Sequence, residues 1–222
     1  MSSAPQHAPI IYPDSDGQPM SDNTLQFRWI VLIKENLETL FADDPAVFVA
    51  GDLLWYPVEG RPDIRRAPDA MVVFGRPKGY RGSYKQWEEG NLAPQVVFEV
   101  LSPNNTPREM REKLRFYERY GVEEYYLYDP DGNHLEGWQQ VGTSLEPLDV
   151  LDGWVSPRLG IRFALAARPE LVIYRPDGQS FLSHQELDRR ATRAEQRALQ
   201  SEQRATRLAE KLRALGIDPE EL

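Results

Sequence analysis

The chain contains no cysteine and only three histidines among its 222 residues. The absence of cysteine excludes disulfides, thiolate nucleophiles and thiolate zinc sites, and it favours a reducing compartment, so we expect a cytoplasmic protein. Two of the histidines, His7 and His184, lie in or beside the expected tails, and the third is His134. A histidine-ligated zinc site and a Ser-His-Asp triad are therefore not expected. The chain also lacks a glycine-rich phosphate loop.

Long apolar runs are missing as well. No stretch is long enough to span a bilayer, and the N-terminus lacks the basic start and apolar segment of a signal peptide. We therefore expect residues 1–21 to form a flexible leader. The net charge of −9 speaks against indiscriminate nucleic-acid binding, although a basic patch can be hidden in an acidic total. The length suits one folded domain with tails.

The first half of the chain predicts one helix followed by several strands. Residues 22–41 place apolar side chains at helical spacing after a possible cap at Ser21 or Asp22, which indicates an amphipathic helix. Segments rich in Val, Phe, Leu and Trp then predict strands because Pro, Gly and charged residues separate them. These segments are 47–58, 67–75 and 95–102.

The pattern then returns to a helix and further strands. Thr106 as cap, Pro107 in the first turn and Gly121 as the stop predict a helix over 106–121. An aromatic strand and an Asp-Pro-Asp-Gly turn follow, with a hairpin partner around 134–138 and late strands within 141–181. We predict an α/β (α+β) domain over residues 22–183, in which helices pack on a mixed sheet.

From Leu187 the apolar and small residues recur at alternating spacings of four and three. This heptad pattern predicts a helix over 184–222. Its alanines would allow another helix to approach closely, which favours a coiled-coil homodimer; the alternative is a solvated helix that folds back on its own domain. The positions are Leu187, Ala191, Ala194, Ala198, Ser201, Ala205, Leu208, Leu212 and Leu215.

Two carboxylates interrupt the apolar strands. Glu99 lies in the middle of "VVFEV", and Asp69 follows Pro68 at the head of another strand. Burying an unpaired carboxylate costs several kcal/mol, so each needs a partner. A divalent cation would serve both, since two carboxylates form the oxygen-rich site that magnesium prefers. The alternative is structural, with Asp69 capping a turn and Glu99 facing water from an edge strand.

The residues around these acids resemble a known family. The segments "APDAMVVFG", "PQVVFEVLSPNN", "EKLRFYERYGVEEYYLYDP" and "GDLLWYPVEG" are together similar to the Uma-two family of endonuclease-like proteins. That family resembles a branch of the PD-(D/E)XK nuclease superfamily, and the likeness spans residues 22–180. It implies a restriction-endonuclease-like fold and a magnesium- or manganese-dependent endonuclease.

The resemblance also implies which residues form the site. Asp69 and Glu99 match the two metal-binding acids, and the main-chain carbonyl of Val100 would be a third ligand. The superfamily expects Lys two positions after the second acid, where this chain has Leu101. Lys113, on the next helix, matches the lysine of the family's own pattern and has a stem long enough to reach the site. In this assignment it positions water or stabilises developing negative charge.

Three further acids are weaker candidates. Asp52, expected within a strand, matches an acid common in the family and could hold a second metal or a water. Glu35 and Glu38 lie on the first helix, where carboxylates usually face solvent. The family often has His on that helix, and Gln26 or Ile30 stands near that position here, which leaves the helix's part in the site open.

A basic stretch could face DNA. Residues 61–85 carry seven basic and two acidic side chains, so their balance is seven minus two, or plus five. Tyr80, Tyr84 and Trp87 interleave with these charges and either stack on bases or anchor a loop to the sheet. The candidate DNA-binding residues are Arg65, Arg66, Arg76, Lys78, Arg81 and Lys85.

The function predicted on these grounds is metal-dependent hydrolysis of phosphodiester bonds in DNA, with Asp69, Glu99 and Lys113 as catalytic residues. Two alternatives stay open. A metal-free scaffold could keep the fold and bind nucleic acid or a protein partner. A hydrolase of nucleotides or other phosphoesters would share the site but would have no use for an extended basic groove.

Overall fold

The structure is a computed structural model that describes residues 10–15, 17, 19–165 and 169–214. The chain divides into two compact units, Met1–Phe181 and Leu182–Leu222. The first unit is a mixed α/β domain, and the second contains the helix α3 (His184–Ala214). Within the part of the chain described, the helices lack an apolar stretch of membrane-spanning length.

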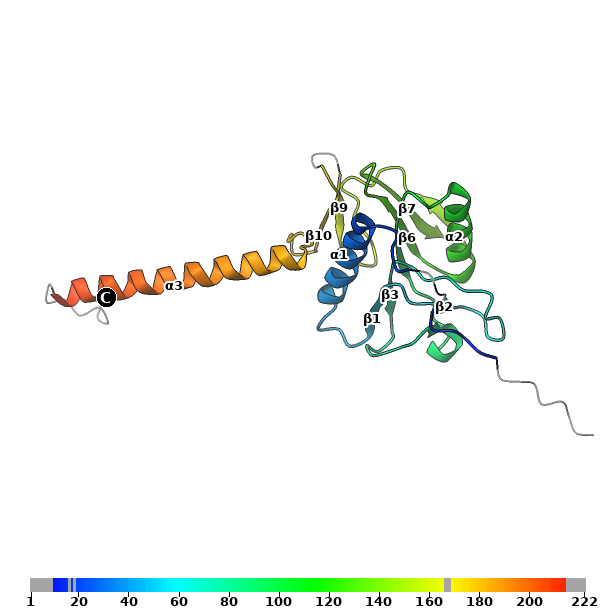
Figure 1. The fold of residues 1–222 in the computed structure, drawn as a ribbon, viewed down its shortest axis with the longest axis horizontal. Helices are drawn as coiled ribbons and strands as arrows, with labels where there is room; N and C mark the ends of the chain where they lie inside the picture. The colour runs from blue at the N-terminus through cyan, green and yellow to red at the C-terminus, as the bar shows by residue number, and fades with distance from the viewer. Residues whose placement is uncertain (1–9, 16, 18, 166–168, 215–222) are drawn as a thin grey trace, which may run out of the picture. The chain divides into compact units, whose positions relative to one another are not determined.

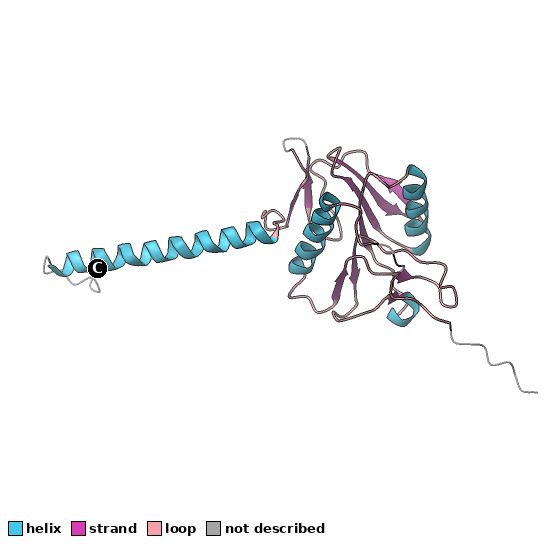
Figure 2. Ribbon diagram, in the orientation of Figure 1, coloured by secondary structure: helices cyan, strands magenta, loops and turns pink. Residues whose placement is uncertain are grey.

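A six-stranded sheet forms the centre of the first unit (Figures 1 and 2). Its order is β1-β3-β5-β6-β7-β8, and only the β5–β6 pair is parallel. A parallel pair needs a crossover connection, and the helix α2 supplies it here. The strands are β1 (Val47–Ala50), β3 (Ala70–Phe74), β5 (Val96–Val100), β6 (Glu124–Asp129), β7 (His134–Val141) and β8 (Ser144–Pro147).

The two faces of the sheet carry separate apolar cores, since successive residues of a strand point to opposite faces. On one face α1 (Thr24–Leu40) packs Trp29, Ile33 and Leu37 against the even-numbered residues of β5, such as Phe98. On the other face α2 (Pro107–Tyr120) buries Tyr117 against Val97 and its neighbours. Residues of β5 are therefore buried whichever way they point, and Glu99 lies on the α2 face.

Short elements complete the domain. A two-stranded parallel sheet joins β2 (Trp55–Tyr56) to β4 (Tyr84–Lys85), and the 3-10 helix η1 (Gln86–Glu89) follows β4. A two-stranded antiparallel sheet joins β9 (Arg162–Ala164) to β10 (Val172–Tyr174). Both late strands fall inside the predicted segments. The strand β8 was not predicted as a separate element.

Several expected boundaries are wrong. The first helix is capped by the Asn23 side chain, which accepts a hydrogen bond from the backbone of Gln26, and not by Ser21 or Asp22. The Asp22 carboxylate instead accepts a hydrogen bond from the Ser102 hydroxyl. Part of the expected leader also packs on the domain: the Tyr12 ring lies 5.3 Å from that of Tyr56. Residues 1–9 lie outside the described chain.

The segment 47–58 is two strands rather than one. Asp52 lies in the bend between β1 and β2 with a φ of 48°, a left-handed conformation that a strand does not contain. The preceding residue, Gly51, is closely packed: a Cβ atom at this position would lie only 3.1 Å from the carbonyl oxygen of Asp69. The Asp52 amide donates to the carbonyl of Pro68 at 3.0 Å. The bend therefore lies beside the start of β3.

Candidate active site

Asp69 and Glu99 lie side by side on the α2 face of the sheet. Ala70 pairs with Phe98 in the antiparallel register, and each acid is the next residue beyond that pair on its own chain segment. A carboxylate oxygen of Asp69 accepts a hydrogen bond from the backbone amide of Val100 at 2.6 Å. Asp69 is 8% and Glu99 2% exposed. The alternative that Glu99 faces water from an edge strand is wrong, because β5 lies between β3 and β6.

The helix α2 closes over Glu99 with two polar side chains. Lys113 Nζ lies 2.7 Å from Glu99 Oε2, and the Tyr117 hydroxyl donates to Glu99 Oε1. The two helix residues are four apart, so they lie on one face of α2. The structure thus places Lys113 against Glu99, as predicted, while its catalytic role stays a prediction. Tyr117 was not among the predicted site residues.

Burial and like charge set the electrostatics of the site. Burial, followed by the neighbouring Glu99 charge, raises the pKa of Asp69 well above its ordinary value. Burial opposes the charged form of Lys113, but the charges of Glu99 and Asp69 outweigh it and raise the pKa of the lysine. Lys113 is therefore a permanent cation that only partly offsets two crowded carboxylates.

Tyr125 is a further polar group at this site that sequence reasoning missed. It is fully buried on β6, and its hydroxyl has no hydrogen-bond partner among the described residues. Burial and then the charges of Glu99 and Asp69 raise its pKa well above the ordinary value, so the phenol is neutral. The strand period offered a signal, because Tyr125 pairs with Val97 and so shares a face with Glu99.

The first helix contacts the site through Gln26. Its side-chain amide donates to the Val100 carbonyl at 2.9 Å, and its own carbonyl oxygen accepts from the Asp22 amide at 2.8 Å. The carbonyl predicted as a third metal ligand therefore already has one donor. Glu35 and Glu38 instead pair with Lys34 on the helix surface.

Asp52 lies next to the acid pair without being buried in it. Its side chain is exposed, and its charge contributes to the raised pKa of Asp69. The bend between β1 and β2 brings it there, through the hydrogen bond of its amide to Pro68. The position is compatible with the secondary role predicted for it.

The donor atoms fit a hard divalent cation only in part. Among the described residues, no group of three or more His, Asp or Glu side chains comes together in a way that could hold a metal ion. Two carboxylates do meet, and burial and then the Glu99 charge raise the pKa of Asp69, an effect that a bound cation would oppose. Magnesium commonly uses one or two carboxylates and fills its other positions with water or substrate oxygens. The residues present are therefore sufficient for such an ion at Asp69 and Glu99.

Comparison with known proteins identifies the family. The model of the Uma2 family, described as "Putative restriction endonuclease", matches residues 17–168. The chain belongs to the Uma2 family. Among curated protein sequences, none matches it significantly. One solved structure similar to this Uma2 protein is described as a "putative nuclease belonging to DUF820" from Anabaena variabilis. That match has 14% identity and a TM-score of 0.45, and it covers 61% of this chain and 73% of the other.

Most of the basic residues predicted to bind DNA have structural partners in this Uma2 chain. Arg81 forms an ion pair with Glu89 at 2.6 Å, with side chains only 12% and 16% exposed, and its guanidinium lies 3.9 Å from the Phe48 ring centroid. Lys78 donates to the carbonyls of the two residues that follow α1. Lys85 pairs with Glu88, and the Arg76 guanidinium donates to the carbonyl of Gly75. The charge balance of the stretch therefore overstated the positive charge available to a ligand.

The aromatic residues of the same stretch divide between the two interpretations. Tyr84 is fully buried and its hydroxyl donates to the Leu92 carbonyl at 2.8 Å, which is an anchoring role. Trp87 contacts the Tyr12 ring at 5.0 Å. Tyr80 is 95% exposed and remains available for stacking.

A different basic surface lies on the side of α2 that is turned away from Lys113 and Tyr117. The guanidinium of Arg66 lies 5.5 Å from the Phe116 ring of α2, which joins the loop before β3 to this helix. The outer side of α2 carries four exposed arginines at helical spacing, which we call the α2 arginine row; the first of them, Arg108, pairs with Glu112 at 2.9 Å. The sequence analysis missed this row, although the spacing was visible. Its members are Arg108, Arg111, Arg115 and Arg119.

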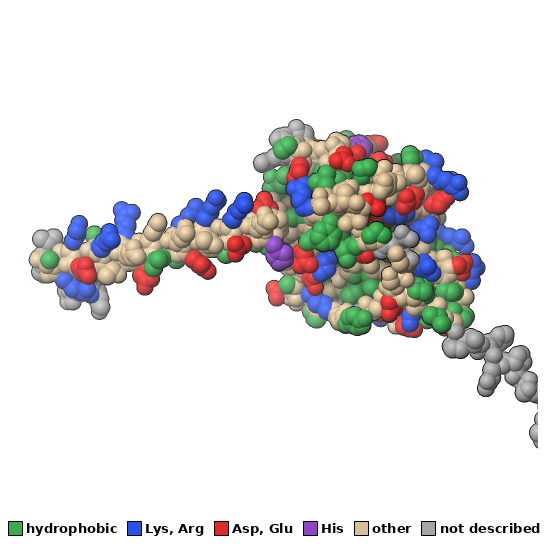
Figure 3. Space-filling view, viewed as in Figure 1, with side chains coloured by type: hydrophobic (Ala, Val, Ile, Leu, Met, Phe, Trp, Pro, Cys, Tyr) green, Lys and Arg blue, Asp and Glu red, His purple; other side chains and the backbone are tan. Residues whose placement is uncertain are grey.

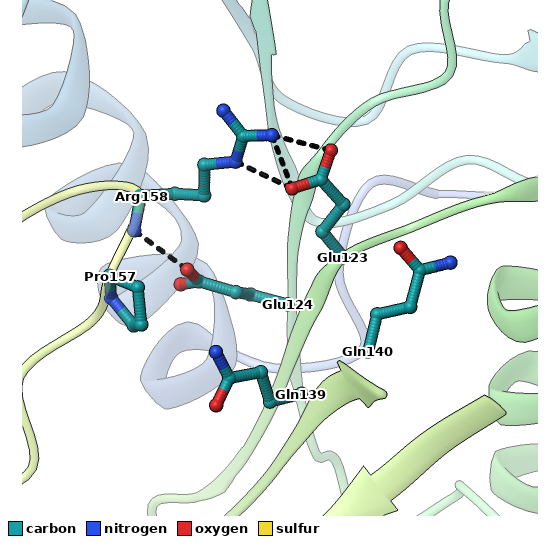
Figure 4. Close-up of a pocket in the computed structure, with 6 residues that line it drawn as sticks. All are labelled: Glu123, Glu124, Gln139, Gln140, Pro157 and Arg158. Atoms are coloured by element: carbon teal, nitrogen blue, oxygen red, sulfur yellow. Dashed lines mark hydrogen bonds and ion pairs between the residues drawn. The ribbon is translucent and has the colours of Figure 1, made fainter. Parts of the chain in front are cut away.

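A pocket of about 330 Å³ lies on the opposite face of the sheet and does not join this site (Figure 4). Glu124 points to the α1 side, where it accepts hydrogen bonds from the Tyr126 and Ser156 hydroxyls and from the Arg158 amide. Arg158 also forms an ion pair with Glu123. These groups hold the loop after β8 against β6. The remaining lining residues are Gln139, Gln140 and Pro157.

Proposed function

We propose that this Uma2-family chain is a metal-dependent endonuclease that hydrolyses phosphodiester bonds in DNA. The observation that carries the proposal is the convergence of two buried carboxylates and an ammonium group: Asp69, Glu99 and Lys113 meet on one face of the sheet. Family membership supports the same reaction class.

Asp69 and Glu99 would hold magnesium or manganese. An ion bound there would lower the pKa of a bound water molecule and would neutralise charge on the scissile phosphate. The protein contributes the fixed positions of the two acids. The Val100 amide orients Asp69, and the Tyr117 hydroxyl orients Glu99.

Lys113 supplies positive charge from the helix instead of the strand. Its Nζ is held at Glu99 and shielded from water, with a side chain 17% exposed. A preorganised cation in a poorly solvated position stabilises negative charge that develops during phosphodiester hydrolysis more strongly than an exposed cation does. Leu101 leaves the usual strand position without a cation, so Lys113 takes that role here.

The helix that carries Lys113 also offers positive charge to a polyanion. Arg66 lies against this helix, and the α2 arginine row lies on its outer side. Phosphate contacts by several arginines give affinity without sequence preference. An extended basic surface of this kind favours DNA over a single nucleotide as substrate. The presence of all three site groups argues against a scaffold that has lost catalysis.

The test is incubation of the purified protein with supercoiled, linear and single-stranded DNA in magnesium or manganese. Conversion of supercoiled DNA to nicked or linear forms is expected for the wild type, and none for the Asp69→Asn variant. Equal cleavage by both proteins would assign the activity to a contaminant or another site. No cleavage of any substrate would favour the scaffold alternative.

A further inference from the structure

The helix α3 presents a regular apolar stripe with no partner in the described chain. None of its described side chains is buried, and Leu187 and Leu208 are 43% and 59% exposed. In the heptad frame the stripe occupies the a and d positions, with Ala191, Ala198 and Ala205 at a. The last predicted member, Leu215, lies outside the described residues.

Charges flank this stripe with one sign on each side. The g positions carry Arg190, Arg197, Arg204 and Lys211, and the e positions carry Asp188, Glu195 and Glu202 before Ala209. Figure 3 shows most of the basic side chains of α3 along one edge of the helix and most of the acidic ones along the other. A merely solvated helix has no need for such segregation around its apolar stripe.

We infer that α3 pairs in parallel and in register with α3 of a second copy of this chain. In a parallel pair each g residue faces the e residue five positions further along the partner helix. Arg190 then faces Glu195 of the partner subunit, and Arg197 faces Glu202 of the partner subunit. Two such pairs per helix make four in the dimer.

The antiparallel arrangement is disfavoured by the same charges. There g faces g and e faces e, which sets Arg190 and Arg197 against basic residues and Glu195 against acidic ones. Like charges at these positions repel, and repulsion selects orientation as effectively as attraction does. The alanine-rich seam buries little apolar area, so the flanking charges weigh more in the choice than they would beside a leucine seam.

The inference is independent of the proposed nuclease activity and is tested by the mass in solution. Light scattering on the full chain should give twice the monomer mass of 25.5 kDa. The Arg190→Glu/Arg197→Glu variant places acid against acid and should raise the dissociation constant of the dimer at least about tenfold. Adding Glu195→Arg and Glu202→Arg to that variant should restore it. The matched control is Arg193→Glu/Arg207→Glu, the same charge change at outer positions, and it should leave the dimer unchanged.

Cross-linking decides the orientation, because the chain has no cysteine of its own. Ala194→Cys should form a disulfide with its own copy under oxidising conditions, since parallel pairing sets position 194 against itself. Antiparallel pairing about the middle of α3 would instead join Ala194→Cys to Ala205→Cys in a mixture of the two variants. A monomeric full chain, an unaffected Arg190→Glu/Arg197→Glu dimer, or a disulfide only in the mixture would each overturn the inference.

Discussion

Lys113 Nζ and Glu99 Oε2 lie 2.7 Å apart although the two residues are 14 positions apart and belong to different elements. The strand provides the acid and the following helix provides the cation. Because the connection between them is short, α2 has to begin near the end of β5 and run back along the sheet. About 1.7 turns into the helix, at Lys113, its inward side passes the carboxylate.

Removal of this cation should destabilise the fold. Lys113→Met keeps the apolar stem but leaves the Glu99 carboxylate buried with only the Tyr117 hydroxyl, so we expect a loss of about 3 kcal/mol in the free energy of unfolding. Urea denaturation measures it. The double variant Lys113→Met/Glu99→Gln should recover much of the loss. The control Arg111→Met, exposed on the same helix, should change stability by no more than about 0.5 kcal/mol. A Lys113→Met midpoint equal to that of the control would contradict the pairing.

Cleavage should depend on the same ammonium group. At a temperature where the variant is folded, Lys113→Met should lower the cleavage rate by about 100-fold or more, on the scale of losing one preorganised charge-stabilising group. Metal affinity should change little. Lys113→Arg should retain part of the activity, because it keeps the charge. Wild-type cleavage by Lys113→Met would show that the lysine is structural only.

Neutralising Asp69 should stabilise the metal-free protein at neutral pH. Burial and Glu99 raise the pKa of Asp69 above its ordinary value of 3.8, so the folded state binds this proton more tightly than the unfolded state. Its contribution to stability is full below about pH 4 and is lost as the pH rises through the folded-state pKa. Asp69→Asn, which can still accept from the Val100 amide, should therefore be more stable by on the order of 1 kcal/mol at neutral pH.

Thermal unfolding across that pH range measures this effect. The difference in melting temperature between Asp69→Asn and the wild type should shrink as the pH falls toward about 4. If this difference in melting temperature instead grows toward acid pH, the folded protein stabilises the charged form of the Asp69 carboxylate, and the assigned direction of its pKa shift is wrong.

Metal binding should raise the melting temperature through these two acids. Magnesium or manganese in excess should stabilise the wild type by linkage, and Asp69→Asn/Glu99→Gln should abolish the shift. Glu35→Gln/Glu38→Gln is the matched control, since both of its acids already pair with Lys34 on the first helix. That control should keep the full shift; losing it would place the ion on the first helix.

DNA affinity should depend on Arg66 and on the α2 arginine row. Arg66→Ala/Arg115→Ala should weaken binding measured without divalent metal and reduce the slope of log affinity against log salt by about 1 for each lost phosphate contact. Arg61→Ala serves as control because Asp63 already neutralises that arginine at 2.6 Å. Equal effects of the two changes would mean that the basic surface contributes only as overall charge.

The acid pair was predictable because it depends on local pattern. A carboxylate inside an apolar strand must find a partner, and strand alternation fixes the face on which it points. The reach of Lys113 was predictable from the short connection after β5. Tyr117 was missed as a site residue, since a tyrosine at helical spacing is equally typical of a core position. Only the structure shows that its hydroxyl lies at Glu99.

The basic loop shows where sequence reasoning fails. A count of charges between residues 61 and 85 cannot tell which of them are paired, and the partner of Arg81 is Glu89, beyond the stretch that was counted. The conformation of Asp52 could not be predicted either, because its bend accompanies the close approach of residues 51 and 52 to Pro68 and Asp69. Both features depend on tertiary contacts, and neither produces a periodic pattern in the sequence.

The arrangement of α2 has a consequence for how the site is lost. Tyr117 is the only fully buried residue of this helix, and Lys113 and Tyr117 contact the same carboxylate. If α2 detaches from the sheet in a local opening, both groups leave together while Asp69 and Glu99 stay on their strands. Catalytic competence and the amide-exchange protection of one short helix are then two readouts of a single equilibrium. Substitutions that loosen α2 anywhere along its length would then abolish the proposed activity without altering either acid.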